Sequence, residues 1–194
     1  EVNENTLIPR PETEELVEWI IESQKSKVQS QKLEILDIGT GTGCIPISLK
    51  TNLLQANVSA IDVSEKALEV AKRNAQSNKV EVNFIQTNIL EVEDLNQHFD
   101  IIVSNPPYVR NLEKQEIKKN VLDYEPHLAL FVEDTDALLF YRKIAQLALE
   151  NLSPNGLLFF EINQYLGKET VELLENLGFK NIELKKDIYG NDRM

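Results

Sequence analysis

Residues 33–43 read LEILDIGTGTG, and this stretch decides the fold. Leu33–Ile38 is a short apolar run that ends at a glycine, which predicts a buried β-strand. Three glycines then follow at alternate positions: Gly39, Gly41 and Gly43. Glycine permits positive φ and lets a ligand touch the backbone, and the helix expected from Cys44 onward would point its N-terminus at the bound group. The stretch therefore predicts a strand, a ligand-binding turn and a helix.

The rest of the chain continues this alternation. Further strand-like runs are Val58–Ile61, Val80–Ile85, Phe99–Val103 and Leu157–Ile162. Amphipathic helical stretches are Glu12–Ser26, Cys44–Asn52, Glu65–Ser77, Asp136–Asn151 and Lys168–Asn176. Strands that alternate with helices are typical of an α/β fold with a parallel sheet covered on both faces. Ligands bind outside the carboxyl ends of such strands, so we expect the functional residues directly after strands.

Length and composition exclude several classes of protein. The 194 residues have the size of one compact domain, spanning 1–194. No apolar run is long enough to span a membrane and the N-terminus lacks a secretory signal, so we expect a cytoplasmic protein without a membrane partner. The net charge of −12 disfavours a clamp on duplex nucleic acid. Cys44 is the only cysteine, and with two histidines it predicts neither an intramolecular disulfide nor a metal site.

Polar residues after the second and third predicted strands favour a nucleoside ligand. Asp62 lies 19 residues beyond Gly43, where a carboxylate can accept hydrogen bonds from both vicinal hydroxyls of a ribose. Taken alone, Asp62 is equally consistent with a helix-capping residue before Ser64, the expected N-cap of the next helix. After the third strand, Asn88 or the backbone at Ile89 is placed to bind an adenine edge, with an ordinary turn as the alternative.

The tetrapeptide Asn105-Pro106-Pro107-Tyr108 follows the fourth predicted strand. Two prolines cannot continue a central strand, so the chain leaves the sheet here with a rigid backbone. The Asn105 side-chain oxygen and the Pro106 carbonyl can together accept both hydrogens of a planar NH₂ group, while the Tyr108 ring packs on its face. This arrangement predicts a site for an amide or an aromatic amine beside the glycine loop.

Together, Asp37–Gly43, Asp62 and Asn105–Tyr108 resemble the methyl-donor loop, ribose carboxylate and substrate motif of class I S-adenosylmethionine-dependent methyltransferases that modify NH₂ nitrogens. The segment Leu7–Glu14, LIPRPETE, is similar to the start of the catalytic domain of HemK-type protein release factor glutamine methyltransferases. Those enzymes methylate the glutamine amide in the GGQ loop of peptide chain release factors. Further matches are Arg73–Ala75, Tyr124–Pro126, Leu130, Asp187 and Gly190–Arg193.

The resemblance implies a Rossmann-like class I methyltransferase sheet that is mostly parallel and ends in an antiparallel hairpin, whose last strand would begin near Arg193. It also implies a small helical substrate-recognition domain in front of the catalytic domain, which is absent from this chain. S-adenosylmethionine would be the cofactor and S-adenosylhomocysteine its product. We expect a monomer that acts on a peptide chain release factor and makes no direct contact with nucleic acid.

The resemblance also implies roles for individual residues. The implied catalytic residues are Asn105, Pro106 and Tyr108. The implied cofactor-binding residues are Asp37, Gly39, Thr40, Gly41, Thr42, Gly43, Asp62, Asn88, Ile89 and Asn105. The implied substrate-binding residues are Arg10, Pro11, Asn105, Pro106, Pro107 and Tyr108, and no metal ligand is implied. For Arg10 a local role has equal weight, namely capping its own helix or pairing with Glu14.

The sequence departs from the family at two places. Asn88 stands where an acid is usual, which leaves the backbone of Ile89 as the expected adenine partner, and Glu161–Gln164 replaces the usual E-I-G start. Two other functions remain open. An NPPY-type amino-methyltransferase could act on another protein glutamine, for example in a ribosomal protein, or on adenine or guanine of RNA or DNA. The second is a nucleoside-binding module without catalysis, although the binding of a nucleoside alone would not require Asn105 and Tyr108.

The nucleic-acid alternative requires a basic groove. The nearby cluster of cations consists of Lys114, Lys118 and Lys119. These lysines alternate with Glu113 and Glu116, which is the pattern of a solvated helix face rather than of a phosphate-binding surface.

Overall fold

The computed structural model describes residues 1–24, 32–110, 112–113, 126 and 130–194. Its helices are α1 (Pro11–Gln24), α2 (Cys44–Asn52), α3 (Glu65–Ser77), α6 (Leu139–Asn151) and α7 (Gly167–Leu177), with 3₁₀ turns η1 (Ile89–Glu91) and η3 (Asp134–Asp136). Its strands are β1 (Glu34–Ile38), β2 (Asn57–Asp62), β3 (Asn83–Gln86), β4 (Phe99–Ser104), β5 (Val109–Arg110), β6 (Phe131–Val132) and β7 (Leu152–Phe160). Within the described ranges, none of the helices is both long and apolar enough to cross a membrane.

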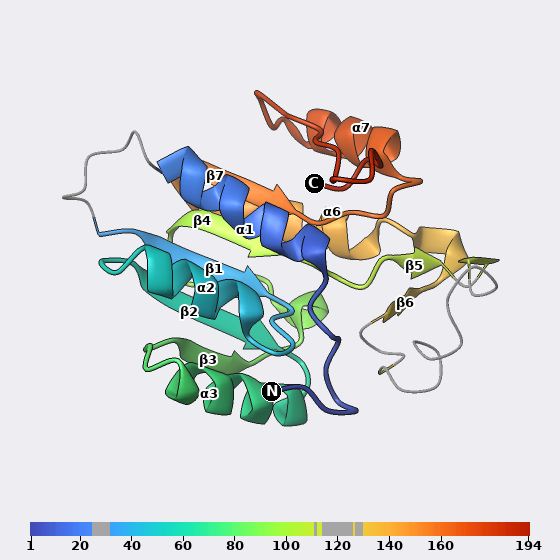
Figure 1. Ribbon diagram of the computed structural model, residues 1–194. Helices are drawn as coiled ribbons and strands as arrows, with labels where there is room; N and C mark the ends of the chain where they lie inside the picture. Colours follow the sequence, from blue (N-terminus) through green and yellow to red (C-terminus); the bar gives the residue numbers. More distant parts are fainter. Residues whose placement is uncertain (25–31, 111, 114–125, 127–129) are drawn as a thin grey trace.

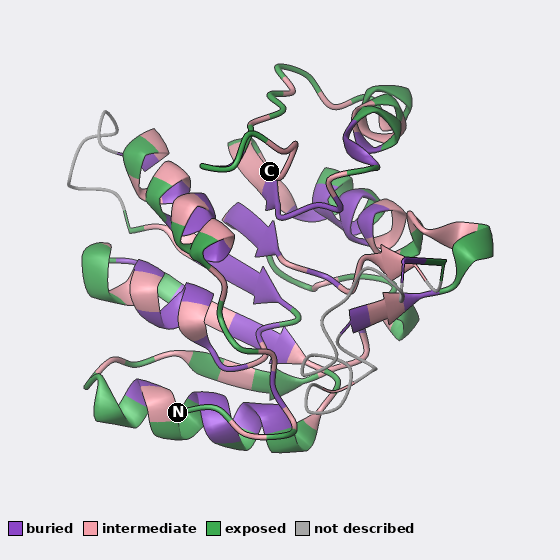
Figure 2. Cartoon of the chain, turned by 45° about the vertical axis from the view of Figure 1, so that its right-hand side comes forward, coloured by how far each residue is buried: buried purple, intermediate pink, exposed green. Residues whose placement is uncertain are grey.

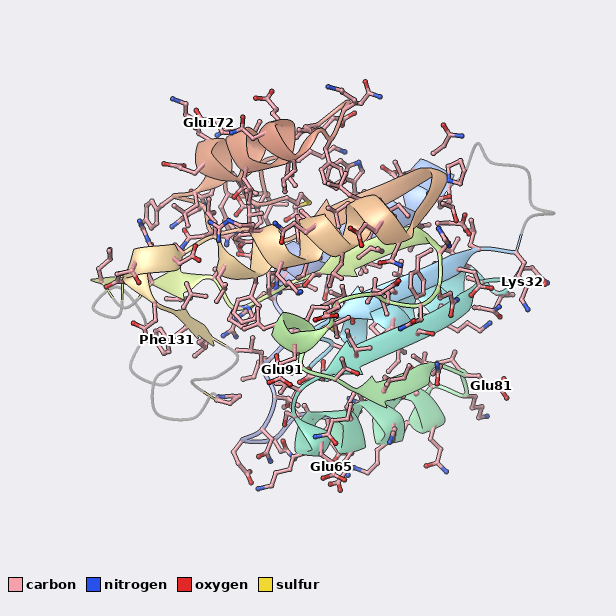
Figure 3. All side chains as sticks on the ribbon, turned by 180° about the vertical axis from the view of Figure 1, so that it is seen from behind. Lys32, Glu65, Glu81, Glu91, Phe131 and Glu172 are labelled. Carbon is pink, nitrogen blue, oxygen red and sulfur yellow. The ribbon has the colours of Figure 1, made fainter. Side chains whose placement is uncertain are left out.

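Five strands form one parallel sheet in the order β3-β2-β1-β4-β7 (Figure 1). Figure 1 shows α1 and α2 in front of this sheet, and Figure 3 shows α6 on the opposite face. The strand order reverses between β1 and β4. These two strands pair directly, and Ile38 at the end of β1 lies opposite Ser104 at the end of β4. Open α/β sheets bind ligands at such a reversal. The predicted α/β fold is confirmed, and the reversal lies between the glycine loop and Asn105-Pro106-Pro107-Tyr108.

Neighbouring residues of β7 show how the two faces of the sheet are covered. Phe159 points to the face of α1, where Trp19 meets it edge-on with the ring centroids 5.1 Å apart. Phe160 points to the face of α6, where Tyr141 meets it edge-on at 5.2 Å. Figure 2 shows buried residues along the central strands. Because both faces are covered, the sheet is a rigid platform for the loops at its carboxyl edge.

Three boundaries differ from the sequence prediction by three residues or more. β3 starts later than Val80, because the Val80 N–H still donates to the Ala75 carbonyl at the end of α3 (3.1 Å). β7 starts earlier than predicted, because Leu152 already pairs with Phe99 ahead of a register shift. α6 starts later than Asp136, because the preceding residues form η3. At β3 and β7 a hydrogen bond or pairing to a neighbouring element sets the boundary, and at α6 the preceding 3₁₀ turn sets it.

The antiparallel hairpin implied for the C-terminus is present as a turn rather than as two strands of the sheet. Lys186 pairs with Asp192 in an isolated antiparallel bridge, and the Arg193 N–H donates to the Lys185 carbonyl (2.9 Å). The Arg193 carbonyl accepts from the Ile162 N–H just beyond β7 (2.7 Å). This turn therefore brings Arg193 to the carboxyl edge of the sheet. A short parallel pair, β5 and β6, was not predicted.

Gly43 is required where the glycine loop meets α3. Its φ is 78°, and a Cβ placed there would lie 3.0 Å from the Ala71 Cβ and 3.2 Å from the Ile47 Cδ1. Gly41 has a φ of 54°, and a Cβ there would meet nothing within 4 Å. Gly43 thus serves the contact between loop and helix, whereas Gly41 faces open space.

We expect Gly43→Ala to lower the free energy of unfolding by about 2–4 kcal/mol, because it combines a left-handed backbone with overpacking against α3. Gly41→Ala is the matched control and should cost only about 1–2 kcal/mol, the backbone contribution alone. Urea denaturation of both variants measures the difference. Equal losses would show that the close contact with α3 carries no cost.

Candidate active site

A pocket of about 370 Å³ opens at the carboxyl edge of the sheet. Its walls come from the loop after β1, the end of β2, η1, the segment after β4, and residues 5–10 in front of α1. Twelve of the predicted site residues line it: Arg10, Gly39, Thr40, Gly41, Thr42, Asp62, Asn88, Ile89, Asn105, Pro106, Pro107 and Tyr108. Pro11, Asp37 and Gly43 are not among the lining residues. A pocket of this volume suits a ligand of nucleoside size.

The glycine loop is tied to the strand and helices around it. Gly39 and Thr40 both donate their N–H groups to the Ile61 carbonyl of β2, at 2.9 and 3.1 Å. On the other side of the loop, the Asn74 side chain of α3 donates to the Thr42 carbonyl at 2.9 Å. Because several backbone groups of the loop are already paired within the protein, its shape exists before any ligand arrives.

Asp62 extends from the end of β2 into the same pocket. Its Oδ2 accepts from the Gly41 N–H (2.8 Å) and its Oδ1 from the Ser64 N–H (2.9 Å). Burial raises its pKa above the ordinary value, and these backbone donors oppose the shift. Ser64, as predicted, is the N-cap of α3 and accepts from the Ala67 N–H. Asp62 is therefore not the cap of that helix, and its carboxylate is oriented toward the glycine loop.

Asp37 is buried beneath the glycine loop. Its side chain is fully inaccessible, and both carboxylate oxygens lack a hydrogen-bond donor in the part of the chain that the structure describes. Burial raises its pKa from 3.8 to about 7, and the charge of Asp62 adds to this effect. The nearby Thr40 hydroxyl opposes the shift without reaching hydrogen-bonding geometry, and its own oxygen is unpaired among the same residues. Buried acceptors without donors mark a place where a ligand or an ordered water completes the site.

The segment after β4 is anchored along its length. The Ser104 hydroxyl donates to the Ile38 carbonyl at 2.6 Å, which ties the end of β4 to the end of β1. The Tyr108 hydroxyl donates to Glu161 Oε1 at 3.1 Å, and burial raises the pKa of Tyr108 well above its ordinary value. The Tyr108 carbonyl accepts from Asn163 Nδ2 at 2.8 Å. Asn105 and the two prolines are thus held between fixed ends.

Several residues at this edge were missed by the sequence prediction. Glu161, directly after β7, is 1% exposed and accepts from the Thr13 hydroxyl at 2.6 Å as well as from Tyr108. Arg193 lies over the Tyr108 ring and forms an ion pair with Asp187 at 3.4 Å. The sequence feature that could have indicated Glu161 is its position as a carboxylate directly after the apolar run LLFF, which belongs to the strand next to β4.

Asn88 and Arg10, which line the pocket, and Pro11, which does not, also have local roles. Asn88 caps η1, because its Oδ1 accepts from the Leu90 N–H (3.2 Å) and its Nδ2 donates to Glu91 (2.8 Å). The Arg10 carbonyl accepts from the Thr13 N–H at the start of α1, and Pro11 is the first residue of that helix. The predicted matches at Tyr124 and Glu125, and the cluster of Lys114, Lys118 and Lys119, lie outside the described residues.

Comparison with known proteins agrees with this geometry. Residues 18–127 match the model of the family "Methyltransferase small domain". The release factor glutamine methyltransferase of Flavobacterium psychrophilum is 72% identical over 193 residues, which cover 100% of this chain and 68% of the relative. The protein of the same name from Bacteroides thetaiotaomicron is 47% identical and is covered to 66%. This chain thus spans about two thirds of the length of these relatives.

A solved structure supports the fold independently. The crystal structure of a ribosomal protein L11 methylase from Lactobacillus delbrueckii subsp. bulgaricus superposes with a TM-score of 0.62 at 20% identity, covering 92% of this chain and 75% of that one. At this identity the similarity concerns the fold alone. The sequence identities supply the closer relationship, and they confirm the resemblance drawn from LIPRPETE and NPPY. This chain belongs to the family of release factor glutamine methyltransferases.

Proposed function

We propose that the protein transfers a methyl group from S-adenosylmethionine to the side-chain amide nitrogen of the glutamine in the GGQ motif of peptide chain release factors. One observation carries the proposal. Asn105-Pro106-Pro107-Tyr108 and the glycine loop after β1 line the same pocket, at the point where the strand order reverses. The name and the 72% identity of the Flavobacterium psychrophilum relative support a release factor as the substrate.

The residues of the pocket fit S-adenosylmethionine. Asp62 would accept from the ribose hydroxyls, and Ile89 would contact the adenine. Thr40 lines the pocket, and Asp37 lies beneath the glycine loop outside that lining; their unpaired buried oxygens suit the positively charged end of the cofactor, because they lack donors in the described chain. When bound, S-adenosylmethionine supplies a methyl group on a positively charged sulfur.

The residues after β4 would act on the glutamine amide. Its nitrogen is a poor nucleophile, because the lone pair is delocalised into the carbonyl. Asn105 Oδ1 and the Pro106 carbonyl would accept both amide hydrogens, which raises electron density on the nitrogen. These acceptors would also stabilise the positive charge that develops there as the new C–N bond forms and the bond from the methyl carbon to sulfur breaks, with S-adenosylhomocysteine as the leaving group. Tyr108 would pack on the amide plane. The methylated nitrogen then loses its proton to water, so no general base is required.

The environment and partners proposed for the protein follow from the same reasoning. A net charge of −12 suits a protein substrate better than a nucleic acid, because a phosphate backbone would be repelled. We propose a cytoplasmic monomer that meets release factors directly and does not contact nucleic acid.

A single labelling experiment tests the function. The intact protein is incubated with labelled S-adenosylmethionine and, separately, with a release factor, a mixture of ribosomal proteins, ribosomal RNA and DNA, and mass spectrometry locates the label. We expect label on the glutamine of the GGQ motif. Label on RNA, DNA or a ribosomal protein and none on that glutamine would overturn the proposal. Binding of S-adenosylmethionine without label on any substrate would indicate a nucleoside-binding module.

We expect Asn105→Ala to lower kcat by about 10²-fold or more while the Kd for S-adenosylmethionine is retained, because the variant removes one acceptor that acts in the transition state. Asn83→Ala, on the exposed strand β3, is the matched control and should leave kcat unchanged. Single-turnover kinetics and calorimetry measure the two quantities. A parallel loss of cofactor affinity would assign Asn105 to the cofactor rather than to the substrate.

We expect Asp37→Asn to stabilise the ligand-free protein at pH 8 by up to roughly 4 kcal/mol. The pKa of Asp37 is raised from 3.8 to about 7 in the fold, so its contribution to stability is full below pH 3.8 and is lost as the pH rises through 7. The variant should therefore gain stability over the wild type as the pH rises from about 4 to about 7 and keep that gain at pH 8, while its affinity for S-adenosylmethionine falls. Urea denaturation and calorimetry check both effects, with Glu81→Gln on the surface as the control.

A further inference from the structure

We infer that Glu161 and Thr13 are positioning residues that set which end of the Asn105 side-chain amide faces the substrate. They hold the NH₂ group of Asn105 against Thr13 and thereby leave its carbonyl oxygen to accept from the substrate amide. The inference rests on the proposed function, and it adds two residues, from α1 and from the end of β7, to the machinery of the same site.

The sheet itself brings Glu161 beside Asn105. Ser104, the last residue of β4, pairs with Phe160, the last residue of β7. Asn105 and Glu161 follow directly after these two residues. The Glu161 N–H donates to the Ser104 carbonyl at 3.0 Å, which continues the parallel pairing to this point. Thr13, in the first turn of α1, is 5% exposed and lies between the two.

The Glu161 carboxylate dictates the direction of the hydrogen bonds. As an anion it has only acceptor sites, so the Thr13 hydroxyl at 2.6 Å and the Tyr108 hydroxyl at 3.1 Å both donate to it. Burial raises the pKa of Glu161, while the two hydroxyl donors and the positive charge of Arg193 oppose that shift. A carboxylate with two dedicated donors remains a hydrogen-bond acceptor inside the protein.

Thr13 in turn determines which end of the Asn105 side-chain amide can bond to it. A threonine hydroxyl has one hydrogen, and Thr13 has given it to Glu161, so that only lone pairs are left on its oxygen. Asn105 Nδ2 lies 3.5 Å from that oxygen and can donate to it. Turning the amide by 180° would bring two acceptor oxygens together, which is repulsive. The NH₂ group therefore faces Thr13 and the carbonyl oxygen faces away.

The orientation matters for the chemistry, because the substrate amide nitrogen carries two hydrogens. If Asn105 presented its NH₂ group instead, a donor would face a donor, and the developing positive charge on the substrate nitrogen would lose one of its acceptors. Glu161 and Thr13 line the same pocket, and their proposed role is to orient Asn105 rather than to bind a reacting group. They act through Asn105, and Glu161 also holds the Tyr108 hydroxyl.

The test is Thr13→Val, which keeps the side-chain shape and removes the hydroxyl, compared with Thr13→Ser, which keeps the hydroxyl. In the intact protein we expect Thr13→Val to lower kcat for release factor methylation by about 10-fold or more, with the Kd for S-adenosylmethionine changed by less than about 2-fold. Thr13→Ser should restore kcat to within about 3-fold of the wild type. Thr170→Val, which removes an equally buried hydroxyl in α7, is the control and should not change kcat.

A double-mutant cycle separates positioning from a merely structural role. In an Asn105→Ala background, Thr13→Val should cause little further loss, because the group that it orients is already gone. Independent, multiplicative losses would overturn the inference, as would equal kcat values for Thr13→Val and the wild type. If Thr13→Val does not fold, Thr13→Ala replaces it, and an unchanged kcat in that variant would also overturn the inference.

The inference and the proposed function fail in distinguishable ways. If the wild-type protein does not methylate the release factor, the proposed function is wrong. If the wild type methylates it and the Thr13 variants behave alike, the function stands and the positioning role does not.

Discussion

The constraint on which the whole site depends is the parallel pairing of β1 with β4, in which Ile38 lies opposite Ser104. The helix after β1 covers one face of the sheet, while the chain after β4 continues to α6 on the other (Figures 1 and 3). The two loops therefore diverge, and the space between them is not filled by either helix. The glycine loop lines one side of that space and Asn105-Pro106-Pro107-Tyr108 lines the other.

The buried carboxylates on the two sides of the pocket differ in how many hydrogen-bond donors they have. On the side of β4 and β7, the buried Glu161 carboxylate has two hydroxyl donors within the protein. On the side of β1, the Asp37 carboxylate has none among the described residues. A satisfied network is rigid, whereas an unsatisfied acceptor is costly until a ligand or water supplies a donor. On the proposed substrate side, Glu161 is thus satisfied by the described residues, whereas Asp37 on the proposed cofactor side depends on a ligand or water for a donor.

The sequence was sufficient for features that local patterns encode and insufficient for those that packing creates. The glycine loop, Asp62 and Asn105-Pro106-Pro107-Tyr108 each follow a recognisable strand, so their meeting at one edge could be predicted from the strand–helix order. The bond between Thr13 and Glu161 joins residues 148 positions apart and depends on how α1 lies across β7. The spacing of apolar residues along the sequence does not indicate such a contact. The start of β7 was missed for the same reason, because Leu152 is defined as part of the strand by its pairing with Phe99, which is distant in the sequence.

The two backbone donors on Asp62 have a consequence for the choice of sugar. A carboxylate offers about four acceptor sites, two on each oxygen. Ser64 occupies one on Oδ1 and Gly41 one on Oδ2, which leaves one site per oxygen and locks the plane of the group. That remaining pair matches a cis-diol and is half used by a deoxyribose. In its proposed role on the ribose, we expect Asp62 to favour ribonucleosides over deoxyribonucleosides, because the N–H groups of Gly41 and Ser64 fix how its carboxylate is presented.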